Sequence, residues 1–175
     1  RLISLEQGKP ITEAIGEVKR ASEILEWDAG EAQRTYGRII PSEPNLVISV
    51  LRRPIGPVAA FCPWNAPAIS PSRKIGGALA AGCSIILKAS EETPATACAL
   101  VGCFADAGVP PGVLNLVFGV PAEISDYLIK SRVIRLLTFT GSVPVGRALG
   151  ELCARHMKPT IMELGGHSPV IVCPD

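Results

Sequence analysis

The sequence contains 175 residues, the size of one ordinary domain with a single sizeable core. Its 17 basic and 16 acidic residues leave a formal charge of +1, which provides no electrostatic footprint for nucleic acid or for an acidic membrane surface. Residues 54–72 form an uncharged run long enough to suggest a membrane span, but its five prolines would each remove a helical hydrogen bond and exclude a span.

The first predicted element is an amphipathic region over residues 12–35, which we expect to form one helix or two. Apolar residues recur there at helical spacing among charges, and Thr12 is a candidate N-cap. Pro41 and Pro44 end this pattern. Residues 45–54 ("NLVISVLRRP") then join an apolar stretch to a basic pair and a proline, which is typical of an extended arm rather than of a core strand.

Further along the chain, short apolar runs alternate with helical patterns. The predicted strands are 58–62, 84–87, 113–118, 134–139, 160–163 and 170–173. The predicted helices are 69–81, 94–107, 121–131 and 143–156. Gly82 and Gly108 are placed to end the first two helices. This βαβ alternation predicts an α/β fold with a doubly wound parallel sheet.

In such a sheet, ligands bind beyond the carboxyl ends of the strands. Three polar segments are predicted to lie there, namely "PWN" (63–65), "KASEE" (88–92) and "TGS" (140–142). In the third, Gly141 turns the chain and Ser142 is placed to cap the next helix, whose free N–H groups would form an anion site. A phosphate would fit there, although α/β proteins also cap helices with Gly-Ser where no ligand binds.

The spacing of Gly141 and Gly146 also resembles the first half of a P-loop. Arg147 and Ala148 stand where a P-loop needs Lys and Ser or Thr for the terminal phosphates and magnesium. The sequence therefore disfavours a nucleoside triphosphatase.

The other polar segments offer side chains with two interpretations each. Lys88 and Glu91 leave a predicted buried strand together, where the carboxylate could accept both hydroxyls of an adenosine ribose or simply form a solvated ion pair. Asn65 could donate to an oxyanion or tie a turn. Glu163 ends a predicted strand, where it could act as a general base or belong to a structural ion pair.

The six cysteines form no CxxC pair, and none lies near His156 or His167 at a zinc spacing, so no metal site is predicted. Most are expected to be buried free thiols in a reducing compartment such as the cytoplasm. The chain begins at Arg1 without a methionine and stops at Asp175 directly after a predicted strand. We therefore expect a fragment with sequence missing at both ends.

Five motifs, taken in this order, resemble the aldehyde dehydrogenase superfamily: "PWNAP", "ALAAGCSIILKASEETPATA", "GVPPGVLNLVFG", "FTGSVPVG" and "MELGGHSPVIV". The resemblance runs from about Leu5 to Cys173, and the last four motifs are highly specific at these spacings. It implies a Rossmann-like dinucleotide-binding domain over 55–175, preceded by an N-terminal helical segment (1–37) and an oligomerisation arm (38–54).

The resemblance also implies roles for single residues. Asn65 matches the amide of the oxyanion hole, and Glu163 matches the general base that activates water to hydrolyse a thioester. The expected cofactor is NAD, with NADP as the alternative, and its implied contacts are Trp64, Lys88, Glu91, Gly119, Thr140, Gly141, Ser142, Leu164 and Gly165. Of these, Lys88 and Glu91 match the adenosine-ribose contacts, and the Glu91 carboxylate would repel the 2′-phosphate of NADP. Gly165 and Gly166 leave space for a flat ligand.

The family's nucleophilic cysteine follows the glutamate by a few dozen residues in a GQxC-type motif, and none of the six cysteines matches it. Cys62, beside "PWN", has no nearby His to activate it and is interpreted as structural. We therefore expect the chain to be the cofactor-binding portion of a larger enzyme and inactive alone. A non-catalytic nucleotide-binding or assembly module is the alternative.

Within the family, residues 72–83 ("SRKIGGALAAGC") look most like succinate-semialdehyde dehydrogenases, in which an arginine matching Arg73 binds the far carboxylate of the substrate. A guanidinium at this position could grip a carboxylate bidentately while the aldehyde points at Asn65. A surface arginine, or one paired with a carboxylate of the protein, is the alternative. Ala66 and His167 depart from the usual Phe and Lys, so a broad-range aldehyde dehydrogenase remains the second interpretation.

The partners implied by the resemblance are a small aldehyde substrate and further copies of the chain. Residues 38–54 resemble half of the family's oligomerisation element, so a homodimer or homotetramer is expected. The strand that would pair with this arm is expected beyond Asp175. No nucleic acid or membrane partner is expected.

Overall fold

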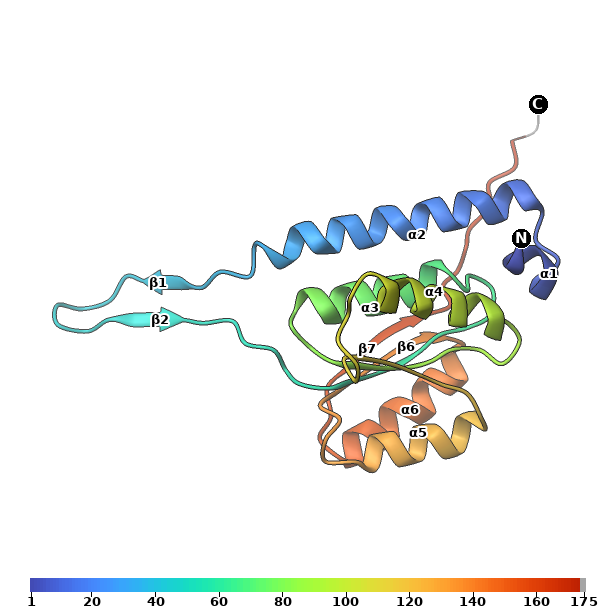
Figure 1. Ribbon diagram of the computed structural model, residues 1–175. Coiled ribbons are helices and arrows are strands. Elements are labelled where there is room, and N and C mark those ends of the chain that lie inside the picture. The colour runs from blue at the N-terminus through green and yellow to red at the C-terminus, as the bar shows by residue number, and fades with distance from the viewer. Residues whose placement is uncertain (174–175) are drawn as a thin grey trace.

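A five-stranded parallel sheet forms the centre of the molecule (Figure 1). The computed structural model describes residues 1–173. The strands stand in the order β5-β4-β3-β6-β7, with the bounds β3 Val58–Phe61, β4 Ile85–Lys88, β5 Leu114–Val117, β6 Leu136–Gly141 and β7 Thr160–Leu164. The chain runs outward from β3 to β5 and then returns to build β6 and β7 on the other side. The sheet is therefore doubly wound, as predicted, and its switch point lies between β3 and β6.

Helices cover both faces of this sheet, with the bounds α3 Ile69–Ala80, α4 Pro94–Asp106, α5 Pro121–Lys130 and α6 Val143–Arg155. The first two lie on one face and the last two on the opposite face (Figure 1). Successive residues of a strand point to opposite faces. Val58 and Ala60 of β3 therefore pack with α3 and α4, whereas Ala59 and Phe61 pack with α5 and α6. Burial on both faces explains why β3 is apolar throughout.

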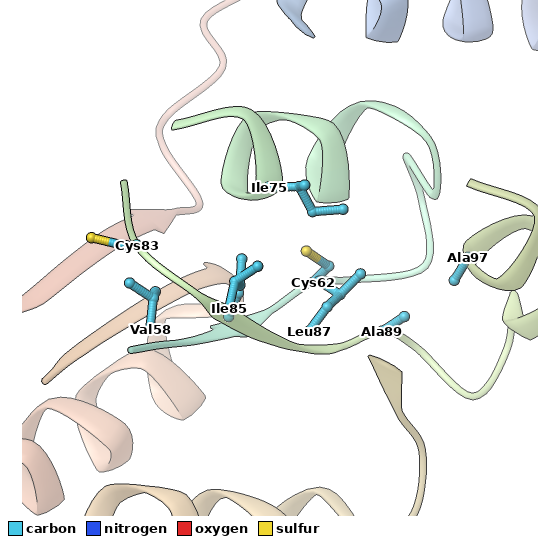
Figure 2. Close-up of a cluster of buried hydrophobic side chains, with 9 residues drawn as sticks. Val58, Cys62, Ile75, Cys83, Ile85, Leu87, Ala89 and Ala97 are labelled. Atoms are coloured by element: carbon cyan, nitrogen blue, oxygen red, sulfur yellow. The ribbon is translucent and has the colours of Figure 1, made fainter. Parts of the chain in front are cut away.

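Figure 2 shows the core on the α3 side of the sheet. Ile75 of α3 packs in one cluster with Ile85 and Leu87 of β4, and all three are almost completely buried. Cys62, which follows β3, belongs to the same cluster. Each buried Ile or Leu side chain stabilises the fold by about 1.5–3 kcal/mol. This layer fixes α3 over the strands whose ends carry the predicted site.

Helices α3 and α4 end just before the two glycines that were predicted to stop them. Gly82 and Gly108 come one residue after the C-cap residues Ala81 and Ala107, and their φ angles are +73° and +89°. Glycine adopts this left-handed backbone without a steric penalty. The prediction that these two glycines stop the helices is confirmed.

The N-terminal segment comprises a short helix, α1 (Leu2–Gln7), and one long helix, α2 (Ile11–Ala32), which passes over α3 (Figure 1). The predicted helical region is therefore mostly a single helix. Thr12, however, is not its N-cap, because the helix begins at Ile11 and its N-cap residue is Pro10. The six residues of α1 are too few for a periodic apolar pattern, so the sequence did not predict this helix.

The arm projects away from the sheet as an antiparallel hairpin of β1 (Arg38–Ile40) and β2 (Ile48–Val50) (Figure 1). Its extended character was predicted, but the pairing of β2 with β1 was not. Pro41 and Pro44 lie in the connection between the two strands, where neither has to donate to the ladder. The further strand expected beyond Asp175 lies outside the described residues.

The strand predicted over residues 170–173 is wrong. Residues 165–173 have no regular secondary structure, and Val170, Ile171 and Val172 are exposed. A strand needs a neighbour for its backbone hydrogen bonds, and β7 is the last strand of the sheet within residues 1–173. Ser168, at φ +43°, also interrupts the extended backbone. In the described part of the chain, no helix is both long and apolar enough to cross a membrane.

Candidate active site

The three polar segments predicted from the sequence meet at the carboxyl edge of the sheet. "KASEE" (88–92) begins at the end of β4, "PWN" (63–65) follows β3, and "TGS" (140–142) begins at the end of β6. These strands are adjacent in the order β4-β3-β6. The segments therefore flank the switch point, where doubly wound sheets bind their ligands.

Glu163 lies at the end of β7, directly opposite Thr140 of β6 in the strand register. Thr140 Oγ1 donates a hydrogen bond to Glu163 Oε2 at 3.2 Å, and Arg73 Nη1 donates to Oε1 at 3.1 Å. The structural ion pair considered for Glu163 and Arg73 thus exists, and its partners are 57% and 50% exposed. An exposed ion pair stabilises a fold by about 0–1 kcal/mol, so either side chain can leave this contact to bind another group.

A second carboxylate, Glu91, is held much more firmly. Lys88 Nζ lies 2.6 Å from its carboxylate oxygens, and the lysine side chain is 7% exposed. Burial tends to raise the pKa of Glu91, but the hydrogen bonds from Lys88 and from the backbone N–H groups of Glu91 and Gly119 outweigh it, so the pKa is lowered. The structure thus joins three of the predicted cofactor contacts and keeps the carboxylate ionised.

A cavity of about 490 Å³ opens between α5 and α6 at this edge of the sheet. Its lining is almost entirely apolar and includes Phe61, Pro121, Ala122, Phe139, Val145 and Ala148. Flat heterocycles bind in such apolar clefts. None of these residues was predicted from the sequence, because an apolar helix face that lines a cavity has the same pattern as one that lines the core.

Gly141 is the last residue of β6, paired with Leu164, and its φ angle is not positive, so the structure shows a close approach at this glycine rather than the predicted turn. An added Cβ on Gly141 would lie 2.5 Å from Phe139 Cζ, so the close approach requires glycine. Ser142 is the N-cap residue, yet its side chain makes no capping hydrogen bond. A capping oxygen usually accepts from the N–H of the second or third helical residue. Pro144 occupies the second position and has no N–H group.

Trp64 and Asn65 are both exposed, and the N-terminal segment contacts their backbone. Gln7 Nε2 donates to the Trp64 carbonyl oxygen at 2.8 Å, and Lys9 Nζ donates to the Asn65 carbonyl oxygen at 3.0 Å. Sequence analysis did not identify these contacts. They join residues more than 50 positions apart, and no local pattern signals them.

Cys62 lies beside this loop but is buried within the core cluster shown in Figure 2. Burial raises the pKa of the Cys62 thiol to about 12, although Lys74 opposes the shift. The thiol is therefore protonated at neutral pH and unsuited to nucleophilic attack, in agreement with its interpretation as structural. Lys74, which the sequence analysis did not single out, donates to Thr138 Oγ1 at 3.0 Å, and burial lowers the pKa of its ammonium group.

Two of the predicted cofactor residues, Leu164 and Gly165, lie at the end of β7, the outermost strand on this side of the site. Leu164 ends β7 and contacts α6, where an added Cβ on Gly146 would lie 2.5 Å from Leu164 Cδ2. Gly165 is exposed directly after this strand, with no heavy atom within 4 Å of an added Cβ. The backbone there is open to solvent, next to Glu163.

Arg73 also lines a second cavity of about 490 Å³, which extends along α2. Arg20 and Trp27 of α2 contribute to its wall, together with Glu23 and Asp28. Trp27 is 68% exposed, unusual for so large an apolar side chain. The sequence analysis did not identify this cavity, because it depends on how α2 lies across α3.

The sequence profile of the aldehyde dehydrogenase family matches residues 1–175. The chain is 57% identical over 175 residues to 4-(hydroxymethyl)benzenesulfonate dehydrogenase TsaD1 from Comamonas testosteroni, and the match covers 99% of this chain and 37% of that protein. It is 46% identical over 176 residues to the NADP(+) succinate-semialdehyde dehydrogenase GabD from Escherichia coli K12, and the match covers 100% of this chain and 36% of that protein.

A solved structure of succinate-semialdehyde dehydrogenase from Burkholderia pseudomallei has the same fold. It matches with a TM-score of 0.96 at 44% sequence identity, over 99% of this chain and 36% of that chain. The chain thus spans a little over a third of the length of these relatives. In sequence over its full length and in fold, the chain belongs to the aldehyde dehydrogenase family.

Proposed function

We propose that this chain is the cofactor-binding part of an NAD-dependent enzyme that oxidises an aldehyde to the carboxylic acid. The observation that supports this most directly is the position of Glu163, half exposed at the carboxyl edge and opposite Thr140. A carboxylate at this place can take a proton from water. Glu163 is the proposed general base, and Asn65 is the proposed oxyanion donor.

The cofactor would lie across the ends of β4, β3 and β6. Glu91, ionised and held by Lys88, would accept hydrogen bonds from the ribose hydroxyls. The apolar cavity between α5 and α6 would hold the adenine, and the start of α6 at Gly141 and Ser142 would receive the pyrophosphate. When bound, the nicotinamide accepts the hydride of the substrate. Other proposed contacts are Trp64, Gly119, Thr140, Leu164 and Gly165.

The reaction would follow the thiol chemistry of the family. A cysteine thiolate adds to the aldehyde carbon and forms a thiohemiacetal, whose oxyanion the Asn65 amide stabilises. Loss of the hydride leaves a thioester. Glu163 then takes a proton from water as the water attacks the thioester, which releases the acid and the thiolate. The nucleophile is proposed to be a cysteine other than Cys62, whose pKa of about 12 keeps it protonated.

The replacement Glu163→Gln tests the proposed base in the full-length protein. Water needs a base and hydride loss does not, so the NADH burst of the first turnover should persist while steady-state turnover falls by about 100-fold or more. Stopped-flow absorbance at 340 nm (the NADH band) measures both phases. A burst that disappears together with turnover would assign Glu163 an earlier role. Cofactor binding without any aldehyde oxidation in the unmodified protein would favour the non-catalytic module.

The proposed substrate is a short aldehyde that carries a carboxylate, such as succinate semialdehyde. Arg73 lies beside the proposed base, and it is exposed enough to exchange the Glu163 carboxylate for one on the substrate. The name of the E. coli relative states succinate semialdehyde as its substrate. A broad-range aldehyde dehydrogenase remains the alternative.

A second candidate substrate class is an aromatic compound that carries a sulfonate. The cavity next to Arg73 contains the exposed indole of Trp27 and a second guanidinium, on Arg20, which forms an exposed ion pair with Glu23. An aromatic ring could stack on the indole while its acidic group meets the arginines. The name of the Comamonas relative states such a compound.

Comparison of kcat/KM for succinate semialdehyde, 4-formylbenzenesulfonate and butanal distinguishes these substrates. An acid-bearing aldehyde should be preferred over butanal, and Arg73→Leu should remove that preference because it removes the guanidinium. Arg132→Leu, in the exposed loop between α5 and the start of β6, is the matched control. Equal use of all three aldehydes by the unmodified protein would support the broad-range enzyme.

The remaining proposals concern the organisation of the protein. We retain the division into an N-terminal helical segment (1–37), an arm (38–54) and a dinucleotide-binding domain (55–175). The arm is proposed to pair with another copy of the chain in a homodimer or homotetramer, because its strands expose apolar side chains outside the body of the molecule.

A further inference from the structure

The loop that carries Asn65 is held from outside by the N-terminal segment. Residues 62–68 connect β3 to α3, and two successive carbonyl groups of this loop accept hydrogen bonds. Gln7 Nε2 contacts the Trp64 carbonyl oxygen at 2.8 Å, and Lys9 Nζ contacts the Asn65 carbonyl oxygen at 3.0 Å. Gln7 ends α1 and Lys9 lies between α1 and α2, so one short segment fixes the exposed part of the loop.

Glu17 of α2 holds the other end of the same loop. Its side chain is 3% exposed, and Oε1 accepts hydrogen bonds from the N–H groups of Ala68 at 2.8 Å and Ile69 at 3.4 Å. These N–H groups begin α3, and Ala68 as N-cap has no side-chain acceptor of its own. A carboxylate from another helix therefore caps α3, where the helix dipole favours a negative charge.

Lys9 joins the two ends of the loop. The ammonium group that contacts the Asn65 carbonyl oxygen also forms an ion pair with Glu17. An ammonium group has three donors and can make both contacts at once. A buried carboxylate needs a paired cation, so Lys9 cannot move towards solvent without disturbing the cap. The position of Asn65 is thereby coupled to the start of α3.

We infer that Lys9 and Glu17 are positioning residues that orient the Asn65 amide, with Gln7 in support. This inference rests on the proposed role of Asn65 as oxyanion donor. A donor acts only when it lies close to the place where the negative charge develops, and a misplacement of about 1 Å costs roughly 100-fold in rate. The contacts of Lys9 and Glu17 therefore control the formation of the acyl-enzyme through the position of Asn65.

A double-mutant cycle in the full-length protein tests this coupling. Lys9→Met should slow the NADH burst by about tenfold, because the Asn65 backbone loses its tether. The Kd for NAD, measured by fluorescence, should stay within about twofold. In an Asn65→Ala background, Lys9→Met should have no further effect, since the amide that it orients is gone. Lys9→Arg, which keeps the charge and the donors, should restore most of the rate.

Two further variants, Gln7→Leu and the control Lys19→Met, are needed because Lys9→Met can fail for a reason unrelated to Asn65. Lys9→Met leaves the Glu17 carboxylate buried without its cation and can unfold the protein. Gln7→Leu removes only the bond to the Trp64 carbonyl, and it should slow the burst by about threefold in the native background and not in the Asn65→Ala background. Lys19→Met, at an exposed lysine of α2, is the matched control and should behave like the unmodified protein.

The outcomes separate the two hypotheses. A normal burst in Asn65→Ala would overturn the proposed oxyanion role. A slow Asn65→Ala together with normal Lys9→Met and Gln7→Leu would overturn the positioning role alone. Losses that simply add in the double variants would also overturn it, because they would show an effect that does not pass through Asn65.

Discussion

Glu91 and Glu163 are carboxylates at the same edge of the sheet, but their cations differ. Glu91 faces Lys88, whose side chain is almost buried, whereas Glu163 faces Arg73, which is half exposed. A buried cation has few alternative positions, so it keeps Glu91 in one geometry suited to binding. An exposed guanidinium can move away and leave Glu163 free to contact water. The surroundings thus agree with the proposed roles, namely cofactor recognition for Glu91 and proton transfer for Glu163.

The replacement Glu91→Ser should narrow the preference for NAD over NADP. In the proposed site the unmodified carboxylate would repel the 2′-phosphate of NADP, and juxtaposed like charges cost several kcal/mol, so the ratio of the two kcat/KM values should change by roughly 10- to 100-fold. Glu92→Ser, at the exposed neighbouring position, is the control and should leave the ratio unchanged. An unmodified protein that prefers NADP would contradict the role of Glu91.

The same carboxylate sets an expected pH dependence. The folded-state pKa of Glu91 is lowered, so its contribution to stability is complete above the usual glutamate pKa and is lost only as the pH falls through the lowered value. The preference for NAD should therefore persist in mildly acidic buffer. Measuring kcat/KM for both cofactors at pH values around the usual glutamate pKa of about 4.3 checks this, because an unshifted carboxylate would lose half of its charge there.

At the scale of elements, the packing of α2 on α3 depends on one glycine. An added Cβ on Gly76 would lie 2.3 Å from Asp28 Oδ2 and 3.1 Å from Asp28 Cγ. The next residue, Gly77, has no heavy atom within 4 Å of an added Cβ. Two adjacent glycines of one helix therefore have opposite environments.

Gly76→Ala should lower the free energy of unfolding by about 1–3 kcal/mol, because α2 must shift away from α3. Gly77→Ala should leave it unchanged or raise it by up to about 1 kcal/mol, since alanine favours a helix more than glycine does. Urea denaturation followed by circular dichroism measures both variants. Equal stability of the two would show that the helices have room to move apart.

The alternation of strands and helices was predictable because it depends on neighbours in the sequence. The predicted helix over 94–107, for example, matches α4 (Pro94–Asp106), where a proline starts the helix and a glycine follows its end. The failed strand at 170–173 shows the limit of such reasoning. Its residues have the composition of a strand, but a strand also needs an adjacent partner, which composition does not supply.

The site was predictable to the same degree. Their positions at the ends of predicted parallel strands place Thr140 and Glu163 at the same edge of the sheet, whereas the strand order that brings them side by side is seen only in the structure. The contacts of Lys9 and Glu17 with the loop after β3 were not predictable, because a lysine after a glycine and a glutamate on a helix are ordinary surface residues in a sequence. Their burial becomes apparent only when α2 lies on α3.

At the scale of the whole molecule, the arm projects away from the sheet and its helices (Figure 1). Ile39 is 75% exposed and Val47 is 78% exposed, and both lie in or beside the hairpin strands. Exposed apolar side chains on a paired, projecting hairpin indicate a contact with another protein surface. This is the basis of the proposal that the arm joins copies of the chain.

Replacing Ile39 and Val47 by lysine should dissociate the proposed oligomer of the full-length protein, so that a lower molecular mass is measured. A charge placed in an apolar contact loses its hydration without a partner, so the interface should weaken. Light scattering coupled to gel filtration measures the mass. Tyr127→Lys, at an equally exposed position on α5, is the control and should keep the original mass. An unchanged mass in the double variant would exclude the arm from the interface.

The carboxylates that cap α3 and α4 have a consequence for synthesis on the ribosome. Glu17 caps α3 from 51 residues upstream, and Glu6 accepts hydrogen bonds from the N–H groups of Ala95 and Thr96, 89 and 90 residues later. The N-terminal segment is therefore made before the helices that it caps, and it cannot reach all of its final contacts until the start of α4 has left the exit tunnel. At about 5–20 residues per second, this delay lasts roughly 5–20 s. During that interval Glu6 remains in water, whereas Glu17 waits only until the start of α3 has emerged, so this segment becomes fixed well after it is made.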